Sequence, residues 1–149
     1  MRAILWGITA LCYIIACVQD LRTCRVVNLL WWISGAAGTV LLLLQRNGRI
    51  GEALPGLLFF ICLQQFLFSR MYGRADCHAF SVCALHLASL GVGLRGYLEQ
   101  MLLAFLFLAI VQFFRKNIAE NGNLKRPVPF LPYITLAFFL VVCYHTTVT

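Results

Sequence analysis

The chain has 149 residues, of which 62% are apolar and 11% charged, and its formal net charge is +7. A soluble domain averages about 45–50% apolar and about 25% charged residues, and a domain this small keeps much of its surface wet. The composition therefore excludes a soluble enzyme, a disordered chain and a small disulfide scaffold. It predicts a membrane protein that crosses the bilayer several times.

Six apolar segments are long enough, or nearly so, to cross a bilayer, which takes about 20 residues and at least about 17 as a helix. In chain order they cover Ala3–Gln19, Val27–Gln45, Ala53–Ser69, His78–Leu94, Leu98–Phe114 and Pro129–Val148. The sequence therefore predicts one all-α membrane domain over residues 1–149, with six transmembrane helices.

The basic residues are distributed unevenly between the two sides of this predicted bundle. Eight lie after the first, third and fifth segments, and they are Arg22, Arg25, Arg70, Arg74, Arg115, Lys116, Lys125 and Arg126. The other four are Arg2, Arg46, Arg49 and Arg95. Because basic loops stay in the cytoplasm, we expect a cell-membrane protein with these odd-numbered loops inside and both termini outside. The charge then marks orientation in the bilayer, and no nucleic-acid partner is expected.

Neither the cysteines nor the other ligand-type residues indicate a metal site. The seven cysteines include no C-x-x-C pair, and most lie within apolar segments, so they are expected to be small buried hydrophobic residues. Cys24 and Cys77 lie in predicted polar loops and are the two candidates for reactivity. We expect no metal and no cofactor.

The chain has only five carboxylates. Glu52 and Glu99 begin apolar segments on the predicted outer side, where a negative charge suits a helix N-terminus. Glu120 lies in a polar stretch and is expected to be solvated. Asp20 and Asp76 both lie at the predicted cytoplasmic edge, where ionisable groups tend to be functional or paired.

Two interpretations of Asp20 and Asp76 follow. Each aspartate pairs with a neighbouring arginine, or the two face each other where the first and fourth helices pack. A facing pair suffices for acid–base hydrolysis without a metal, because one carboxylate activates water while the other, protonated, donates to the leaving group. The helix dipoles favour Asp76 as the base and Asp20 as the acid.

The residues around the aspartates favour a site. Gly73, three residues before Asp76, allows the backbone to approach closely. Asn28, at the start of the second segment, either caps that helix or orients Asp20. His78 either titrates near the aspartates or occupies a helix end.

Three short motifs carry a resemblance to a known family. Asp20 is followed after five residues by Val26-Val27-Asn28, Asp76 ends Gly73-Arg74-Ala75-Asp76, and Pro129-Phe130-Leu131-Pro132 precedes the last segment. In this order and spacing the chain resembles, over essentially its whole length, the type IV prepilin peptidases. These are membrane aspartic proteases of the Gly-x-Gly-Asp class.

The chain departs from the family's pattern at three positions. Val27 stands where proline is usual, Ala75 replaces the commoner glycine, and His78 stands where lysine is frequent. Both aspartates are retained, so these departures bear on substrate choice and rate more than on mechanism. The chain resembles the short, peptidase-only type associated with Tad/Flp-like pili.

The resemblance implies an aspartic endopeptidase that removes the leader of a prepilin or pseudopilin at the cytoplasmic face. The expected catalytic residues are Asp20 and Asp76, supported by Gly73, Ala75 and Asn28. The expected substrate-binding residues are Arg22, Arg25, Arg74 and His78, although the arginines suit lipid phosphates equally well.

Two other functions remain open at this stage. A small ion- or proton-coupled transporter would use the aspartates as relay groups. A catalytically silent pilus-assembly factor would bind pilin helices and tolerate loss of both aspartates. The sequence predicts neither the oligomeric state nor the identity of the prepilin.

Overall fold

The computed structural model describes residues 1–44, 50–118 and 128–148. The helices are α1 (Arg2–Thr23), α2 (Asn28–Leu43), α3 (Ile50–Cys62), α4 (Arg74–Ser89), α5 (Leu94–Ile118) and α6 (Leu131–Val148). Two short elements continue α3, a π-helix η1 (Leu63–Leu67) and a 3-10 helix η2 (Phe68–Arg70). The described residues contain no strand, so the all-α prediction is confirmed. Glu120 and the basic residues Arg46, Arg49, Lys125 and Arg126 lie outside the described ranges.

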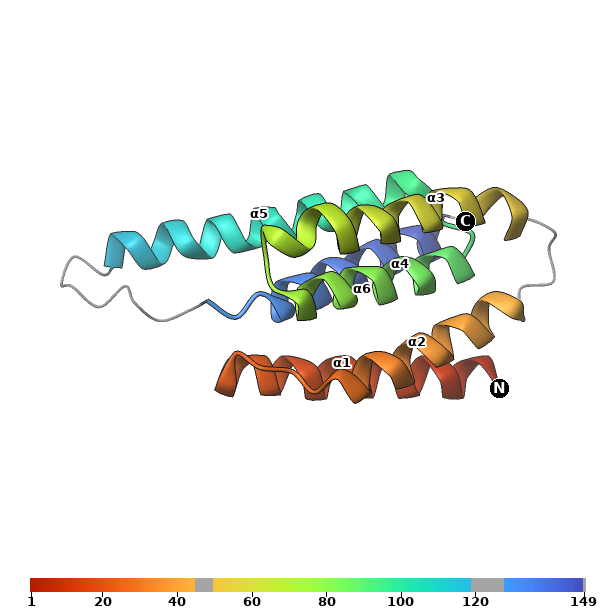
Figure 1. Cartoon of the computed structure of the whole chain (residues 1–149), viewed down its shortest axis with the longest axis horizontal. Coiled ribbons are helices and arrows are strands. Elements are labelled where there is room, and N and C mark those ends of the chain that lie inside the picture. The colour runs from red at the N-terminus through yellow and green to blue at the C-terminus, as the bar shows by residue number, and fades with distance from the viewer. Residues whose placement is uncertain (45–49, 119–127, 149) are drawn as a thin grey trace.

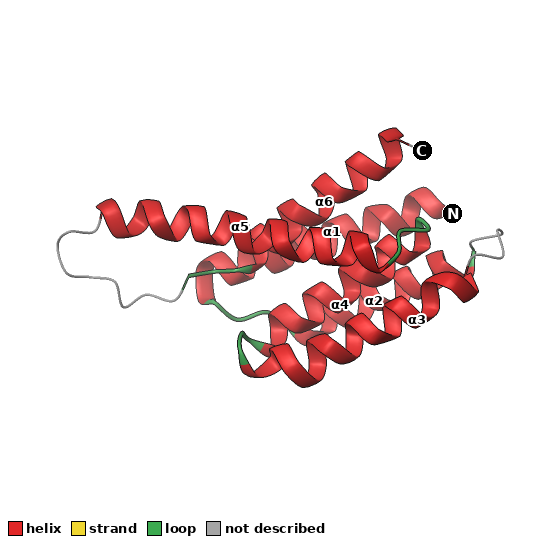
Figure 2. Cartoon of the chain, turned by 90° about the horizontal axis from the view of Figure 1, so that it is seen from above, coloured by secondary structure: helices red, strands yellow, loops and turns green. Residues whose placement is uncertain are grey.

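The helices run alternately in opposite directions, and both termini lie at the same end of the bundle (Figure 1). Helix α4 is central and packs against α2, α3, α5 and α6, whereas α1 packs against α2 and α6. The second view, from above, shows α5 projecting beyond the other helices at the end away from the termini (Figure 2).

The ends of two helices differ from the prediction in a way that matters for the site. Helix α1 continues past Gln19 to Thr23, so Asp20 lies in its last turn. It ends there because Cys24 adopts a left-handed backbone with φ 50°, and its N–H bonds the carbonyl of Asp20 at 2.9 Å. Helix α4 begins at Arg74, before the predicted start, so Asp76 lies in its first turn.

Three helical stretches are long and apolar enough to cross a membrane, namely Arg2–Thr23, Ala53–Arg70 and Leu94–Arg115. Two shorter apolar stretches are Asn28–Leu43 and Leu131–Thr147. Large apolar side chains point away from the core along these helices, including Ile4, Ile14, Trp32, Phe66, Leu102 and Phe113. Contact of such an apolar surface with lipid is favourable, whereas its exposure to water would be unfavourable. The described residues form six α-helices, and six membrane spans remain a prediction.

Helices α2 and α4 approach closely because α2 has glycine where α4 has a large buried side chain. A methyl group at Gly38 would lie 2.9 Å from Cε1 of His86, whereas one at Gly35 would lie 3.8 Å from its nearest neighbour, in Val82. Small residues that let backbones approach are typical of helix packing in membranes, where dispersion contacts hold helices together.

Candidate active site

Hydrogen bonds between α1 and α4 define how the two helices are aligned. The hydroxyl of Thr9 lies 2.8 Å from Nε2 of His86. About one turn further along α1, the hydroxyl of Tyr13 lies 3.0 Å from Sγ of Cys83 and 3.5 Å from the carbonyl oxygen of Ala79. All of these groups are buried. The helices are therefore antiparallel with a fixed register.

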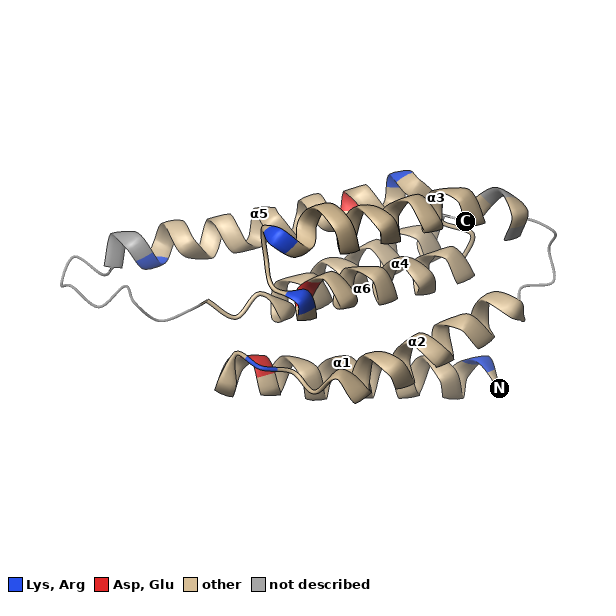
Figure 3. Cartoon of the chain, viewed as in Figure 1, with Lys and Arg blue, Asp and Glu red and all other residues tan. Residues whose placement is uncertain are grey.

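This register brings Asp20 and Asp76 to the same level. Asp20 lies seven residues after Tyr13, and Asp76 lies seven residues before Cys83. Seven residues is about two helical turns on either helix, so the aspartates continue the same pair of facing stripes. The acidic positions of α1 and α4 accordingly lie at the same end of the bundle (Figure 3).

The two carboxylates interact electrostatically. Asp76 precedes the predicted membrane segment, and burial, followed by the charge of Asp20, raises its pKa to about 7. Two like charges in a partly dry site cannot both ionise easily. Asp76 is therefore mostly protonated below about pH 7, which favours the role of acid over the role of base expected from the helix dipoles.

Pairing of the aspartates with arginines, the alternative interpretation, is not observed. Among the described residues the single ion pair joins Arg95 to Glu99, on α5. Arg22, Arg25 and Arg74 are exposed, so they lie around the site without neutralising it.

Asp20 is anchored by the start of α6. The backbone N–H of Leu131 donates a hydrogen bond of 3.0 Å to Oδ2 of Asp20, which is itself buried. The first N–H groups of a helix have no partner within it, so the carboxylate satisfies one of these donors on α6. Oδ2 is consequently an acceptor, and its position is fixed by the Pro129-Phe130-Leu131-Pro132 motif.

The same motif contacts the loop that precedes Asp76. The ring of Phe130 lies 6.0 Å from that of Tyr72 and 5.2 Å from that of Phe105, measured between centroids. The hydroxyl of Tyr72 donates to Oε1 of Gln64, in the π-helical turn η1. An aromatic cluster thus links the start of α6, which bonds Asp20, to the loop that precedes Asp76. Sequence reasoning missed Tyr72, and only Gln64 carried a signal, as a polar residue in an apolar run.

Gly73 and Ala75 shape the turn into α4. Gly73 occupies the N-cap position, and its carbonyl oxygen accepts the N–H groups of Asp76 and Cys77 at 3.0 and 3.2 Å. A methyl group at Gly73 would lie 3.3 Å from Oδ2 of Asp76, so glycine permits the close approach that the sequence predicted. Ala75 is half-buried beside it. Cys77 is buried inside α4, so its expected place in a polar loop is wrong, whereas Cys24 is exposed as predicted.

Asn28 does not cap α2. The N-cap is the extended residue Val27, which makes no side-chain cap hydrogen bond, and Asn28 is the first helical residue. The N–H of Val27 instead donates a hydrogen bond of 3.1 Å to Oε1 of Gln19, and this bond fixes the loop between α1 and α2. Asn28 faces a different feature, an apolar groove beside the aspartates.

This groove, hereafter the α2–α4 groove, has a volume of about 590 Å³. Its floor is apolar and includes Trp31, Trp32 and Val82, and its polar wall includes Asn28, His78 and Ser81. Nε2 of Gln65 lies 3.2 Å from the hydroxyl of Ser81 and 3.5 Å from Nδ1 of His78. His78, in the polar wall, lies two residues after Asp76 on α4, although neither aspartate lines the groove.

The described residues contain no cluster of three or more histidine, cysteine or carboxylate side chains that could hold a metal ion. Comparisons of the chain with protein-family models, with curated proteins and with solved structures found no match.

Proposed function

We propose that this protein is a membrane aspartic endopeptidase that removes the leader peptide of type IV prepilins or pseudopilins, of the Tad/Flp-like class. The observation that carries the proposal is that Asp20 and Asp76 lie at the same level of α1 and α4, where the charge of Asp20 raises the pKa of Asp76, with no arginine paired to either among the described residues. The resemblance to Gly-x-Gly-Asp proteases rests on motifs that include the same two residues, and it supplies the substrate class.

The two aspartates take different roles in the proposed reaction. Asp20, which accepts a hydrogen bond from Leu131, is the base that takes a proton from water. The hydroxide oxygen attacks the carbonyl carbon of the peptide bond to give a tetrahedral intermediate. Asp76, whose pKa is raised to about 7 so that the protonated form is accessible, donates its proton to the leaving nitrogen as the C–N bond breaks. The proton on Asp20 then restores Asp76, so the pair starts each cycle with one proton.

The α2–α4 groove suits the apolar helix of such a substrate. It is open and mostly apolar, and its polar wall includes Asn28 and also His78, which lies two residues after Asp76 on α4. In a prepilin, the leader is cut just before the apolar helix. If that helix lay in the groove, the cleavage point would be placed at Asp20 and Asp76, hereafter the dyad. Arg22, Arg25 and Arg74 are exposed around this end, and they would contact acidic groups of the substrate or lipid phosphates.

The orientation follows from the distribution of basic residues. With the positive loops in the cytoplasm, the dyad faces the cytoplasm, where a prepilin leader lies before export, and both termini lie outside. The protein is then a multi-pass cell-membrane enzyme.

Co-expression with a candidate prepilin tests the proposal. The wild-type chain should shorten the prepilin, which is seen as a faster band on a gel. Asp20→Asn and Asp76→Asn should each leave it full-length, and Glu99→Asn, a matched removal of a carboxylate from another helix, should not. A full-length prepilin with the wild type would instead support a silent assembly factor, and cleavage by both aspartate variants would show that neither aspartate is catalytic.

A further inference from the structure

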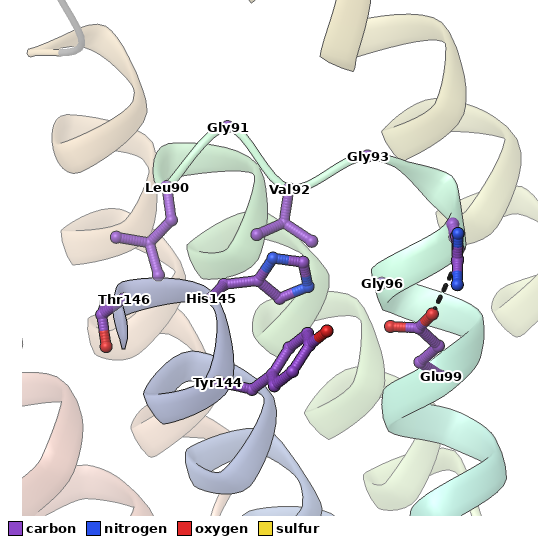
Figure 4. A pocket seen from close by; sticks show the side chains of 10 residues that line it. Leu90, Gly91, Val92, Gly93, Gly96, Glu99, Tyr144, His145 and Thr146 are labelled. Carbon is purple, nitrogen blue, oxygen red and sulfur yellow. Dashed lines mark hydrogen bonds and ion pairs between the residues drawn. The ribbon is translucent and has the colours of Figure 1, made fainter. Parts of the chain in front are cut away.

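The end of the bundle opposite the aspartates contains a polar cavity of about 480 Å³. It lies between the turn that joins α4 to α5 and the last turns of α6 (Figure 4). In this view Glu99 of α5 lies across from Tyr144 of α6, with His145 and Val92 beside them. No step of the proposed peptidase reaction uses these residues.

The charged groups of this cavity are an arginine and a glutamate on one face of α5. Nε of Arg95 donates to Oε1 of Glu99 at 2.7 Å. This bond uses one of the guanidinium's three nitrogens and leaves the two Nη groups to bind a second anion. A planar guanidinium with two such groups matches the oxygens of a phosphate.

A second, apolar cavity continues from the polar one. It has a volume of about 470 Å³ and runs between α5 and α6, lined by Leu102, Leu103, Leu106, Leu140 and Val141. Glu99 and Tyr144 line both cavities, so the two meet. From Glu99 to Leu106 the groove follows α5 for about 10 Å, at about 1.5 Å per residue.

We propose that this joined pair of cavities binds a glycerophospholipid, with the phosphate on Arg95 and one acyl chain in the groove between α5 and α6. An amphiphile is required because one cavity is charged and the other apolar, and a bilayer supplies such a molecule. Arg95 and Glu99 together carry no net charge, so a headgroup with both a phosphate and an ammonium, as in phosphatidylethanolamine, complements them best.

Native mass spectrometry of the full chain in detergent, with three added probes, tests the proposal. Dioleoylphosphatidylethanolamine has both parts of the ligand, dioleoylglycerol lacks the phosphate, and glycerophosphoethanolamine lacks the chains. The first should be retained at one molecule per chain, about tenfold more than either of the others, which is the effect of losing one charge-assisted hydrogen bond or the apolar contacts. Dioleoylphosphatidylglycerol, which is anionic, should be retained less than the zwitterionic lipid.

Variants show whether the lipid lies in this site. Arg95→Gln should reduce retention of phosphatidylethanolamine to the level of dioleoylglycerol. Leu103→Trp, which fills the groove, should reduce retention of both phosphatidylethanolamine and dioleoylglycerol. Leu140→Trp, from the opposite wall, provides a second filling variant if the first alters thermal unfolding. Arg2→Gln is the matched control, because Arg2 lies at the same end but bonds the carbonyl of Leu44 outside the cavity. Equal retention of all lipids, or equal loss in Arg2→Gln and Arg95→Gln, would overturn the proposal.

Discussion

The backbone N–H of Leu131 and the carboxylate of Asp20 are joined by a buried hydrogen bond of 3.0 Å, although 111 residues separate them in sequence. This bond couples the last helix to the end of the first. It gives Asp20 a structural role in addition to its proposed chemical one, since the carboxylate satisfies a donor at the start of α6.

The two roles of Asp20 can be separated by substitution. Asp20→Asn keeps an oxygen that accepts the N–H of Leu131, whereas Asp20→Ala leaves that donor unsatisfied. We expect Asp20→Ala to be less stable than Asp20→Asn by about 1 kcal/mol, the usual cost of a lost helix cap. Thermal unfolding in detergent measures the difference, and equal stability of the two variants would show that the cap contributes nothing.

The raised pKa of Asp76 predicts how stability depends on pH. The folded state holds the proton up to about pH 7, whereas an unfolded aspartate releases it near its ordinary value of 3.8. Between these values the folded state binds more protons, so stability should be full below about pH 4 and should fall as the pH rises through 7.

Asp76→Asn should reduce this dependence and should exceed the wild type in stability at pH 8 by at least about 1 kcal/mol. Asp20→Asn should move the decline to lower pH, because it removes one of the two causes of the raised pKa. Unfolding temperatures measured from pH 4 to pH 8 test both statements. A wild-type curve that rises with pH over this range would contradict them.

Much of the site was predictable because the chain has so few carboxylates. Two aspartates at one predicted membrane edge, with Gly73 before one of them, favoured a facing pair over pairing of each aspartate with an arginine. The bond from Leu131 to Asp20 was not predictable, because a backbone N–H has no sequence signal of its own. The cap, one of the two roles expected for Asn28, is absent for a similar reason, since Gln19 of another helix bonds the preceding residue.

The contact between Gly38 and His86 should limit what α2 tolerates. Gly38→Ala places a methyl group 2.9 Å from the imidazole and should cost about 1–3 kcal/mol through overpacking. Gly35→Ala on the same helix has its nearest neighbour at 3.8 Å, and it should be neutral or stabilising because alanine favours helix. Thermal unfolding of the two variants checks this, and equal stability would mean that the helices separate at little cost.

Filling the α2–α4 groove should weaken substrate binding. Gly35→Leu projects into the groove and should reduce kcat/KM for prepilin cleavage by about tenfold or more, the effect of displacing one or two apolar groups. Gly7→Leu on α1 is the matched control, because a side chain there meets nothing within 4 Å and lies outside the groove. An equal effect of the two variants would place the substrate helix elsewhere.

The most direct test of the central claim is mass spectrometry of a purified prepilin after incubation with the purified protein in water enriched in oxygen-18. If Asp20 and Asp76 activate water, the wild type should yield a leader whose new carboxyl group carries one heavy oxygen. Asp20→Asn and Asp76→Asn should yield no leader, although each unfolds cooperatively. Release of labelled leader by either variant at the wild-type rate would contradict the assignment of the two aspartates as the catalytic pair.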